Sequence, residues 1–400
     1  MARVLISSLG TGDIQKDSDQ DYKKTIYSID DKEYPDTLTA KVLINHFSIE
    51  KVIFVGTNKS MWDNLYYNLD GSDEKYLDFL TDKKQIGVIN QDLQQLKECI
   101  DNFLNQVGSE ILLISYEQNN QNEIWDNFEK LLEVKDFLNI DDEIYLDITH
   151  GFRYMPILNL FLLEFISIFK DPSVKIKGVY YGMFSGQKSE IIDFKILFDL
   201  LEWTKAINMF KRNSNAQQLI ELLEKNGNID IANIFIHFSN NLNLANMSSL
   251  WEFMKGANEK IKKLANSDNK IIKLLSSDII NMTLRFDKEK QSDFQYELSI
   301  WLAENKSYAL SYIALYEAII TKSCELSSYD VNNKDQREKA KKSIGNDKWG
   351  QYFYTKHNNS ISEIRNSIAH QSNERKNMVL QDINKLQDFI KTFKSYFDMS

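Results

Sequence analysis

The chain has 400 residues, which fits two or three domains, and its 42% hydrophobic and 26% charged residues exclude wholesale disorder. A net charge of −10 argues against a protein that coats nucleic acid without specificity. The two cysteines lie far apart in the sequence, which argues against a disulfide scaffold and a cysteine-based zinc site, and we expect no metal.

Strand-like and helix-like segments alternate over the first 200 residues. The first is a short apolar strand, Arg3–Ser8. The other expected strands are Lys51–Val55, Glu110–Ser115, Glu143–Ile148 and Lys175–Tyr181, and the expected helices are Thr37–His46, Asp92–Val107, Ile124–Phe137 and Met155–Phe169. Because the strands are continuously apolar, the pattern predicts an α/β fold with a mostly parallel, Rossmann-like sheet covered on both faces. Ligands of such sheets bind at the carboxyl ends of the strands.

The second half contains no proline and no period-two pattern, so we expect an all-α region. The expected helices are Leu200–Phe210, Ala216–Glu224, Ile229–Phe238, Met247–Leu264, Lys270–Leu284, Asp293–Ser327, a segment around Ser360–His370, and Lys376–Phe397. The Asn- and Lys-rich stretch Ser328–Lys342 is expected to be an exposed connector.

Charge supports a division into two parts, because residues 1–200 carry a net charge of −14 and the remainder carries +4. The apolar segment Met155–Phe169 is interrupted by Asn159 and Glu164 and falls short of a bilayer span. The apolar N-terminal stretch is too short for a signal peptide. We therefore expect a cytoplasmic chain with no membrane partner.

Two loops that follow strands are rich in glycine and hydroxyl groups. They contain Ser8, Gly10, Thr11 and Gly12 in the first loop, and Gly56, Thr57, Lys59 and Ser60 in the second. Glycines let the backbone turn sharply and direct N–H groups at an anion, and the hydroxyls add donors. Plain strand-to-helix turns are the alternative for both loops, because glycine pairs are weak motifs.

A third loop combines more specialised groups. Asp147 ends an apolar strand, so its carboxylate needs a partner, either local backbone N–H groups or Arg153. Thr149, His150 and Arg153 follow, and Gly151 permits a close approach before the next helix. Helix capping with an incidental histidine is the alternative interpretation.

Together the three loops predict a site for a compact, phosphate-bearing nucleotide held by backbone amides. The chain has no Gly-x-x-x-x-Gly-Lys-Ser/Thr motif, which disfavours a P-loop triphosphatase. The first loop lacks the third glycine of the dinucleotide fingerprint, which weakens an oxidoreductase interpretation.

The segment from Ser360 to His370 carries the other candidate site. Ser360 and Glu363 form a capping box, which predicts the start of a helix, and isoleucines at 361, 364 and 368 would face inward. Asn366 and His370 are four residues apart and share the opposite face, and the long stem of Arg365 can reach the same cleft. An exposed helix with a solvated Arg and His is the alternative.

These three residue types suit cleavage of RNA without a metal, in which the ribose 2′-OH attacks the adjacent phosphorus. His370 can transfer the proton, Arg365 can neutralise charge on the phosphorane, and Asn366 can orient the histidine or a phosphate oxygen. One histidine per chain is too few for an acid–base pair. A two-fold homodimer that pairs this helix with its copy would supply two.

Both ends of the chain resemble one family. Residues 147–151, Asp-Ile-Thr-His-Gly, resemble the Asp-x-Thr-His-Gly signature of CRISPR-associated Rossmann-like (CARF) sensor domains, and the turns at 9–12 and 56–62 are similar to loops of the same group. Arg365-Asn366-x-x-x-His370 resembles the HEPN ribonuclease motif. The pairing is similar to type III CRISPR ancillary ribonucleases.

The resemblance implies an antiviral endoribonuclease that cyclic oligoadenylate activates and that cuts single-stranded RNA. The ring expected is tetra-adenylate, with hexa-adenylate as the alternative. The resemblance implies a CARF domain at 1–199 and a HEPN domain at 291–400. Residues 200–290, which the resemblance does not cover, are expected to be a helical connector. It places these residues near the ring: Gly10, Thr11, Thr57, Lys59, Thr149, His150 and Arg153. Two other functions stay open: a non-catalytic sensor whose helical half binds DNA or a protein, and a nuclease that degrades the ring.

Overall fold

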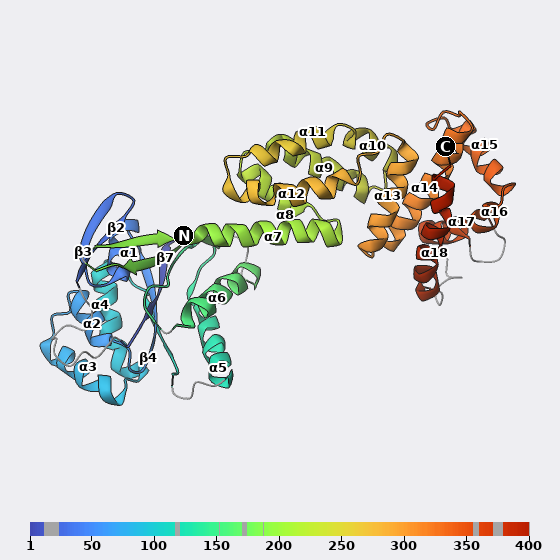
Figure 1. Cartoon of the computed structure of the whole chain (residues 1–400). Helices are drawn as coiled ribbons and strands as arrows, with labels where there is room; N and C mark the ends of the chain where they lie inside the picture. The colour runs from blue at the N-terminus through green and yellow to red at the C-terminus, as the bar shows by residue number, and fades with distance from the viewer. Residues whose placement is uncertain are drawn as a thin grey trace. The chain divides into compact units, whose positions relative to one another are not determined.

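The computed structural model (Figure 1) describes residues 1–11, 24–116, 121–151, 153–169, 174–186, 188–354, 360–370 and 379–399. Of residues 169, 370, 379 and 380 only the backbone is described. The chain divides into two compact units, Met1–Phe198 and Asp199–Ser400.

An eight-stranded sheet forms the middle of the first unit. Its order is β3-β2-β8-β7-β6-β1-β4-β5. The strands are β1 (Arg3–Leu9), β2 (Thr25–Ile29), β3 (Lys32–Asp36), β4 (Lys51–Thr57), β5 (Glu110–Ile114), β6 (Glu143–Asp147), β7 (Lys175–Phe184) and β8 (Lys188–Asp193). The five strands from β7 to β5 in this order are mutually parallel, while β7 pairs with β8 and β2 with β3 in antiparallel fashion. The predicted mostly parallel sheet is confirmed.

Helices cover both faces of this sheet. They are α1 (Thr39–Phe47), α2 (Trp62–Asn68), α3 (Glu74–Ile86), α4 (Gln94–Leu104), α5 (Gln121–Leu131) and α6 (Met155–Phe169), with short 3-10 helices η1 (Asn90–Leu93) and η2 (Leu132–Phe137). Leu5 of β1 packs in a cluster with side chains of α1 to α4, whereas Val4 and Ile6 pack in a second cluster with α6. Successive side chains of a strand point to opposite faces, which explains the continuously apolar sequence.

Strand β1 lies between β4 and β6. After β1 the chain first forms β2 and β3 at the far edge of the sheet, then β4 and β5 on one side of β1, and later β6 on its other side. The crevice at the carboxyl ends of such neighbouring strands is where ligands of open α/β sheets bind. All three predicted ligand loops follow these strands.

The sequence did not predict the edge hairpin of β2 and β3. Its turn consists of Asp30 and Asp31, which both have positive φ angles of 47° and 61°. That is the backbone of a type I′ turn, which usually carries glycine or asparagine, so the turn signal was weak. Pro35 also speaks against a strand, but β3 is the edge strand of the sheet and an edge tolerates proline. Strand β8 and helices α2 and α3 were missed as well.

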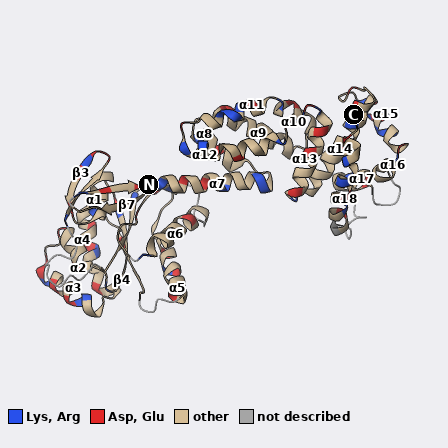
Figure 2. Ribbon diagram, viewed as in Figure 1, with Lys and Arg blue, Asp and Glu red and all other residues tan. Residues whose placement is uncertain are grey.

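The second unit is helical, as predicted. Its helices are α7 (Lys195–Asn213, which begins in the first unit), α8 (Gln217–Lys225), α9 (Ile229–Asn243), α10 (Met247–Met254), α11 (Ala257–Ile261), η3 (Lys262–Asn266), α12 (Lys270–Leu284), α13 (Gln291–Glu304), α14 (Tyr308–Leu326), α15 (Lys334–Gly345), α16 (Gly350–Tyr354), α17 (Ile361–His370) and α18 (Val379–Phe397). One buried apolar cluster extends from Trp203 to Ala314, and another from Tyr312 to Phe397. Lys211 and Arg212 form the basic last turn of α7, seen as its blue end in Figure 2.

Three expectations for this unit are wrong in detail. The single helix predicted at Met247–Leu264 is divided into α10, α11 and η3, with a break at Gly256, which has a φ of +84°. The stretch predicted as a connector contains α15, because Asn333 caps its first turn and Ala340 and Ile344 are buried one turn apart. The single helix predicted at Asp293–Ser327 is two helices, α13 and α14, separated at Lys306, which has a φ of +59°. No described helix combines the length and the hydropathy that crossing a bilayer requires.

Candidate ligand and catalytic sites

The loops that follow β1 and β4 are joined by hydrogen bonds. The Ser60 hydroxyl donates to the Leu9 carbonyl oxygen at 2.7 Å, and the Met61 N–H donates to the Gly10 carbonyl oxygen at 3.0 Å. Because β1 and β4 are parallel neighbours, their carboxyl ends already lie side by side. The first two predicted loops thus form one connected surface.

The second loop is folded around its own hydroxyls. The Thr57 N–H donates to the Ser60 Oγ at 2.9 Å, and the Lys59 N–H donates to the Thr57 Oγ1 at 3.3 Å. The Trp62 Nε1–H donates to the Thr57 carbonyl oxygen at 2.8 Å. A Cβ atom at Gly56 would lie 2.6 Å from the Trp62 ring, so glycine is required there. The Lys59 side chain remains exposed above this scaffold.

Asp147 anchors the third loop. Its carboxylate is fully buried and accepts hydrogen bonds from the Ser7 hydroxyl at 2.8 Å and from the Thr149 N–H at 2.9 Å. Of the two predicted alternatives, the local N–H group is confirmed and Arg153 is not the partner; the Ser7 hydroxyl is a further partner that was not predicted. The Thr149 hydroxyl in turn accepts from the Gly182 N–H at 2.8 Å. The loop therefore has a fixed shape before any ligand arrives.

Gly151 brings this third loop against β1. Its φ of +118° lies in a region that side chains avoid, and a Cβ atom there would approach the Ser8 Cβ to 3.0 Å. The buried Ser8 Oγ accepts from the Asn159 Nδ2 at 3.1 Å. Asn159 is fully buried in the mostly apolar helix α6. Ser8 of the first loop thus contacts both Gly151 of the third loop and the buried Asn159 of α6.

His150 lies in this same loop. Burial lowers its pKa, and the opposing effect of the Asp147 carboxylate is smaller. The imidazole is therefore neutral at pH 7. In this state it can donate and accept a hydrogen bond but offers no positive charge to a phosphate.

The predicted ligand residues differ in solvent exposure. The exposed ones are Lys59, Gly151 and Arg153; the half-buried ones are Gly10, Thr11, Thr149 and His150; the buried ones are Ser8, Gly56, Thr57, Ser60 and Asp147. Gly12 lies outside the described residues. Neither Lys59 nor Arg153 forms an ion pair with any described residue, so both cations are available to a ligand.

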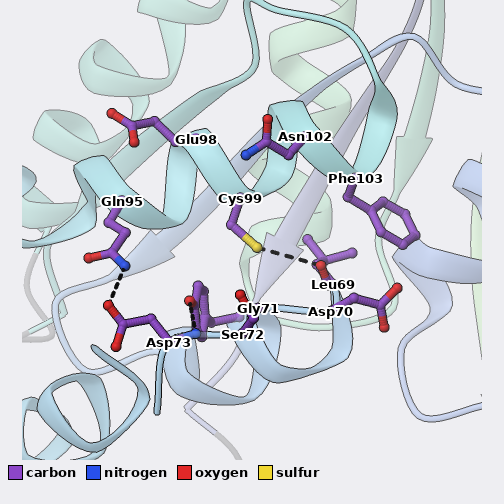
Figure 3. Close-up of a pocket in the computed structure, with 11 residues that line it drawn as sticks. Leu69, Asp70, Gly71, Ser72, Asp73, Gln95, Glu98, Cys99, Asn102 and Phe103 are labelled. Carbon is purple, nitrogen blue, oxygen red and sulfur yellow. Dashed lines mark hydrogen bonds between the residues drawn. The ribbon is translucent and has the colours of Figure 1, made fainter. Parts of the chain in front are cut away.

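A cavity of about 630 Å³ lies elsewhere in this unit, between the loop after α2 and helix α4. Figure 3 shows Asp70, Asp73 and Glu98 at its wall, and Cys99, whose thiol faces the Leu69 carbonyl oxygen. Its lining residues include three carboxylates and no Lys or Arg. A phosphate-bearing ligand would be repelled there, which favours the strand-end loops as the anion site.

Helix α17 begins as predicted. The Ser360 N–H donates to the Glu363 Oε2 and the Glu363 N–H donates to the Ser360 Oγ, both at 3.3 Å. Ile361 and Ile364 are buried in the C-terminal cluster, and Ile368 packs against it. The capping box and the inward face of the helix are confirmed.

Tyr316 of α14 positions Arg365. The guanidinium carbon lies 5.1 Å from the centre of the Tyr316 ring, and the Arg365 Nη1 donates to the Asn366 Oδ1 at 3.3 Å. The Arg365 Nε is buried and has no hydrogen-bond partner among the described atoms. Arg365 and Asn366 are thus brought together, while the side chain of His370 lies outside the described residues.

Three supporting residues were not identified from the sequence. Tyr316 gave no signal, and Ser7 gave none for its bond to Asp147, because each acts through a partner distant in sequence. Asn159 did give one, as a polar residue within an apolar helix. Among the described residues, no group of three or more His, Cys, Asp or Glu could hold a metal ion.

Residues 4–184 match the family described as the CARF domain of the CRISPR system endoribonuclease Csx1. The first unit is a Csx1-type CARF domain. Residues 199–293 match the second domain of the CRISPR-associated protein MJ1674. That protein, from Methanocaldococcus jannaschii, is 31% identical over 433 residues, covering 99% of this chain and 66% of its own length. The chain thus spans just under two thirds of this curated relative.

Among solved structures, Enterococcus italicus Csm6 bound to cyclic hexa-2′-fluoro-hexa-dAMP is similar, with 12% identity and a TM-score of 0.40. The match covers 98% of this chain and 93% of Csm6. At that TM-score the likeness says nothing about the ligand of this chain.

Proposed function

We propose that this chain is a cyclic oligoadenylate-activated endoribonuclease of type III CRISPR antiviral defence. The observation that carries the proposal is the joined arrangement of three strand-end loops in a CARF domain of the Csx1 type, a family whose description names an endoribonuclease. Cyclic oligoadenylate is the activator that the sequence resemblance implies.

In the sensor site, the ring lies over the carboxyl ends of β1, β4 and β6. Gly10 and Thr11 offer backbone N–H groups, and the exposed Lys59 and Arg153 balance phosphate charges. The neutral His150 hydrogen-bonds to a base or a ribose. Cyclic tetra-adenylate is the expected ring, with hexa-adenylate as the alternative.

In the nuclease site, two copies of α17 face one another across the two-fold axis of a homodimer, in the 291–400 HEPN domain. His370 from each copy moves the proton between the ribose 2′-OH and the leaving 5′ oxygen. Arg365 lies over Tyr316 and faces the phosphorane. Asn366 orients the Arg365 guanidinium by accepting a hydrogen bond from it. Residues 200–290 connect this domain to the sensor.

The decisive experiment is a fluorogenic single-stranded RNA assay with a panel of cyclic oligoadenylates of different ring sizes. Cleavage that depends on one ring supports the proposal and identifies the activator. Degradation of the cyclic oligoadenylate without RNA cleavage would favour a ring nuclease. The absence of both reactions would favour a non-catalytic sensor. EDTA should leave cleavage unchanged, and metal dependence would contradict the proposed chemistry.

A further inference from the structure

A polar pocket of about 500 Å³ lies within the second unit, where the α7–α8 turn, α9 and the start of α14 meet. Its walls are amide and hydroxyl side chains: Asn213, Ser214, Asn215, Gln217, Ser239, Asn240, Asn243 and Ser307. Its apolar lining residues are Ala216, Ile220, Ile236, Leu242 and Leu310. None of these lining residues is charged, although charged residues make up 26% of the chain.

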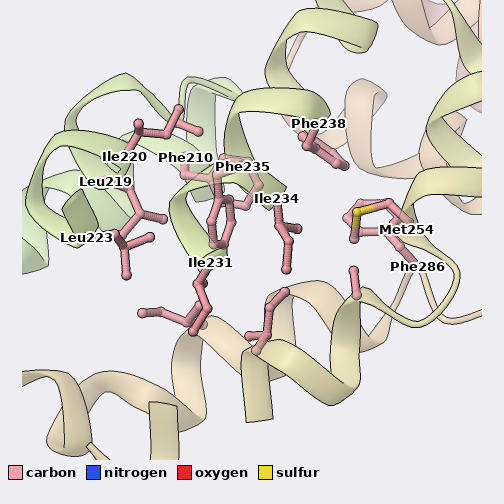
Figure 4. Close-up of a cluster of buried hydrophobic side chains, with 14 of the residues drawn as sticks. Phe210, Leu219, Ile220, Leu223, Ile231, Ile234, Phe235, Phe238, Met254 and Phe286 are labelled. Carbon is pink, nitrogen blue, oxygen red and sulfur yellow. The ribbon is translucent and has the colours of Figure 1, made fainter. Parts of the chain in front are cut away.

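The apolar floor of the pocket is part of a packed cluster. Ile220 and Leu242 belong to the first large cluster of the helical unit, part of which Figure 4 shows. Phe210 and Phe235 stack edge to face in this cluster, with ring centroids 5.2 Å apart and an interplanar angle of 89°. A ligand on this floor meets a preformed apolar surface.

The polar wall from α9 keeps hydrogen-bonding capacity for a ligand. The Ser239 Oγ is buried and bonds to no described atom. Asn240 and Asn243 are exposed, and their side-chain amides bond to no described residue. These three residues share one face of α9 with Ile236. A flat, uncharged ring with donors and acceptors at its edge matches this wall, because amides pair with the edges of nucleobases.

Three cations adjoin lining residues of the neutral pocket in the sequence, and one of them, Lys211, lines a separate cavity beside Asp278. Lys211 and Arg212 directly precede the lining residue Asn213, and Lys306 directly precedes Ser307. All three side chains are exposed, and none is ion-paired within the described part of the chain. An uncharged hollow with exposed cations close by along the chain suits a nucleotide whose base enters the hollow while its phosphates stay outside it.

We infer that this pocket holds an unpaired base of single-stranded RNA, as a binding site separate from the cleavage site. The inference rests on the proposed function, because RNA is the substrate there. It assigns a role to part of the segment between the sensor and the nuclease, and base insertion would select single strands, because bases in a duplex are stacked and paired.

The test measures binding without cleavage. A fluorescent single-stranded RNA is titrated into the full-length His370→Ala chain by fluorescence anisotropy, alone and combined with Asn240→Asp. A carboxylate at position 240 cannot donate a hydrogen bond to the base, so we expect about a tenfold loss of affinity. The control, Asn233→Asp, adds the same charge to α9 at an exposed asparagine outside the pocket and should change affinity less than about twofold.

An RNA of the same length with abasic residues separates base recognition from charge. It should bind the parent chain about tenfold more weakly than normal RNA and should respond equally weakly to both asparagine variants. Equal affinity for normal and abasic RNA, or equal losses at positions 233 and 240, would overturn the inference. If Asn240→Asp fails to fold, Asn243→Asp tests the same wall. Failure of the proposed function shows separately, as absent cleavage by the wild-type chain with every ring.

Discussion

Lys59 and Arg153 differ from the other residues of the strand-end loops. The buried Thr57, Ser60 and Asp147 hold those loops in shape by hydrogen bonds within the protein, whereas the two exposed cations have no partner among the described residues. Different residues thus hold the loops in shape and contact the ligand. Replacing a supporting residue should distort the loops, and replacing a cation should weaken binding alone.

Lys59→Ala and Arg153→Ala should each raise the activator concentration for half-maximal RNA cleavage by about tenfold, because each removes one charge-assisted hydrogen bond to phosphate. The maximal rate should be unchanged. The control, Lys32→Ala, removes an exposed cation from edge strand β3. An unaltered dose response in both site variants would refute these contacts.

His150 should make the stability of the CARF domain depend on pH. Burial lowers its pKa in the folded state below the ordinary value of 6.5. The unfolded chain therefore binds a proton before the folded chain does, and stability present above pH 6.5 is lost as the pH falls below it. In thermal melts between pH 5 and 8, His150→Gln should lose less stability on acidification than the wild type. Parallel curves for the two proteins would contradict this assignment.

Helix α17 carries the proposed catalytic groups, and its first turn holds it in register. The capping box joins Ser360 to Glu363, the buried Ile361 and Ile364 fix the inward face, and Arg365 lies over Tyr316. The helix is only ten residues long, so packing and capping supply most of its stability.

Ser360→Ala should therefore destabilise the helical unit by about 1 kcal/mol, since it removes the cap of α17. Chemical denaturation measures this change. Ser362→Ala serves as control, because Ser362 is also buried on α17 but takes no part in the cap. Equal destabilisation by both substitutions would show that the cap contributes nothing specific.

Elements with a strong local pattern were predictable from the sequence, and those defined by tertiary context were not. The apolar segment predicted both ends of α6 correctly, and the capping box predicted the start of α17. The β2–β3 hairpin was hidden by Asp30 and Asp31, whose turn lacks the usual glycine. For the candidate site, motifs predicted the loops, but the Ser7–Asp147 bond joins residues 140 positions apart and no local pattern encodes it.

Sensing and cleavage are assigned to different units of the chain. The CARF domain supplies strand-end loops that suit an anionic ring, and α17 in the other unit supplies the pair of Arg365 and Asn366. One chain offers one His370, so the proposed chemistry needs two chains.

Sedimentation should accordingly give a mass twice that of the 46.8 kDa chain. The activity per chain should fall on dilution once dimers dissociate, because a monomer has half of the nuclease site. A monomer that keeps full activity per chain at every concentration would rule out the shared site.

The separation of sensing from cleavage is tested most directly by His370→Ala. Activator binding by calorimetry and RNA cleavage are measured on the same preparation, next to wild type. We predict an unchanged dissociation constant for the cyclic oligoadenylate and no detectable cleavage. Undiminished cleavage, or loss of activator binding together with cleavage, would contradict the account.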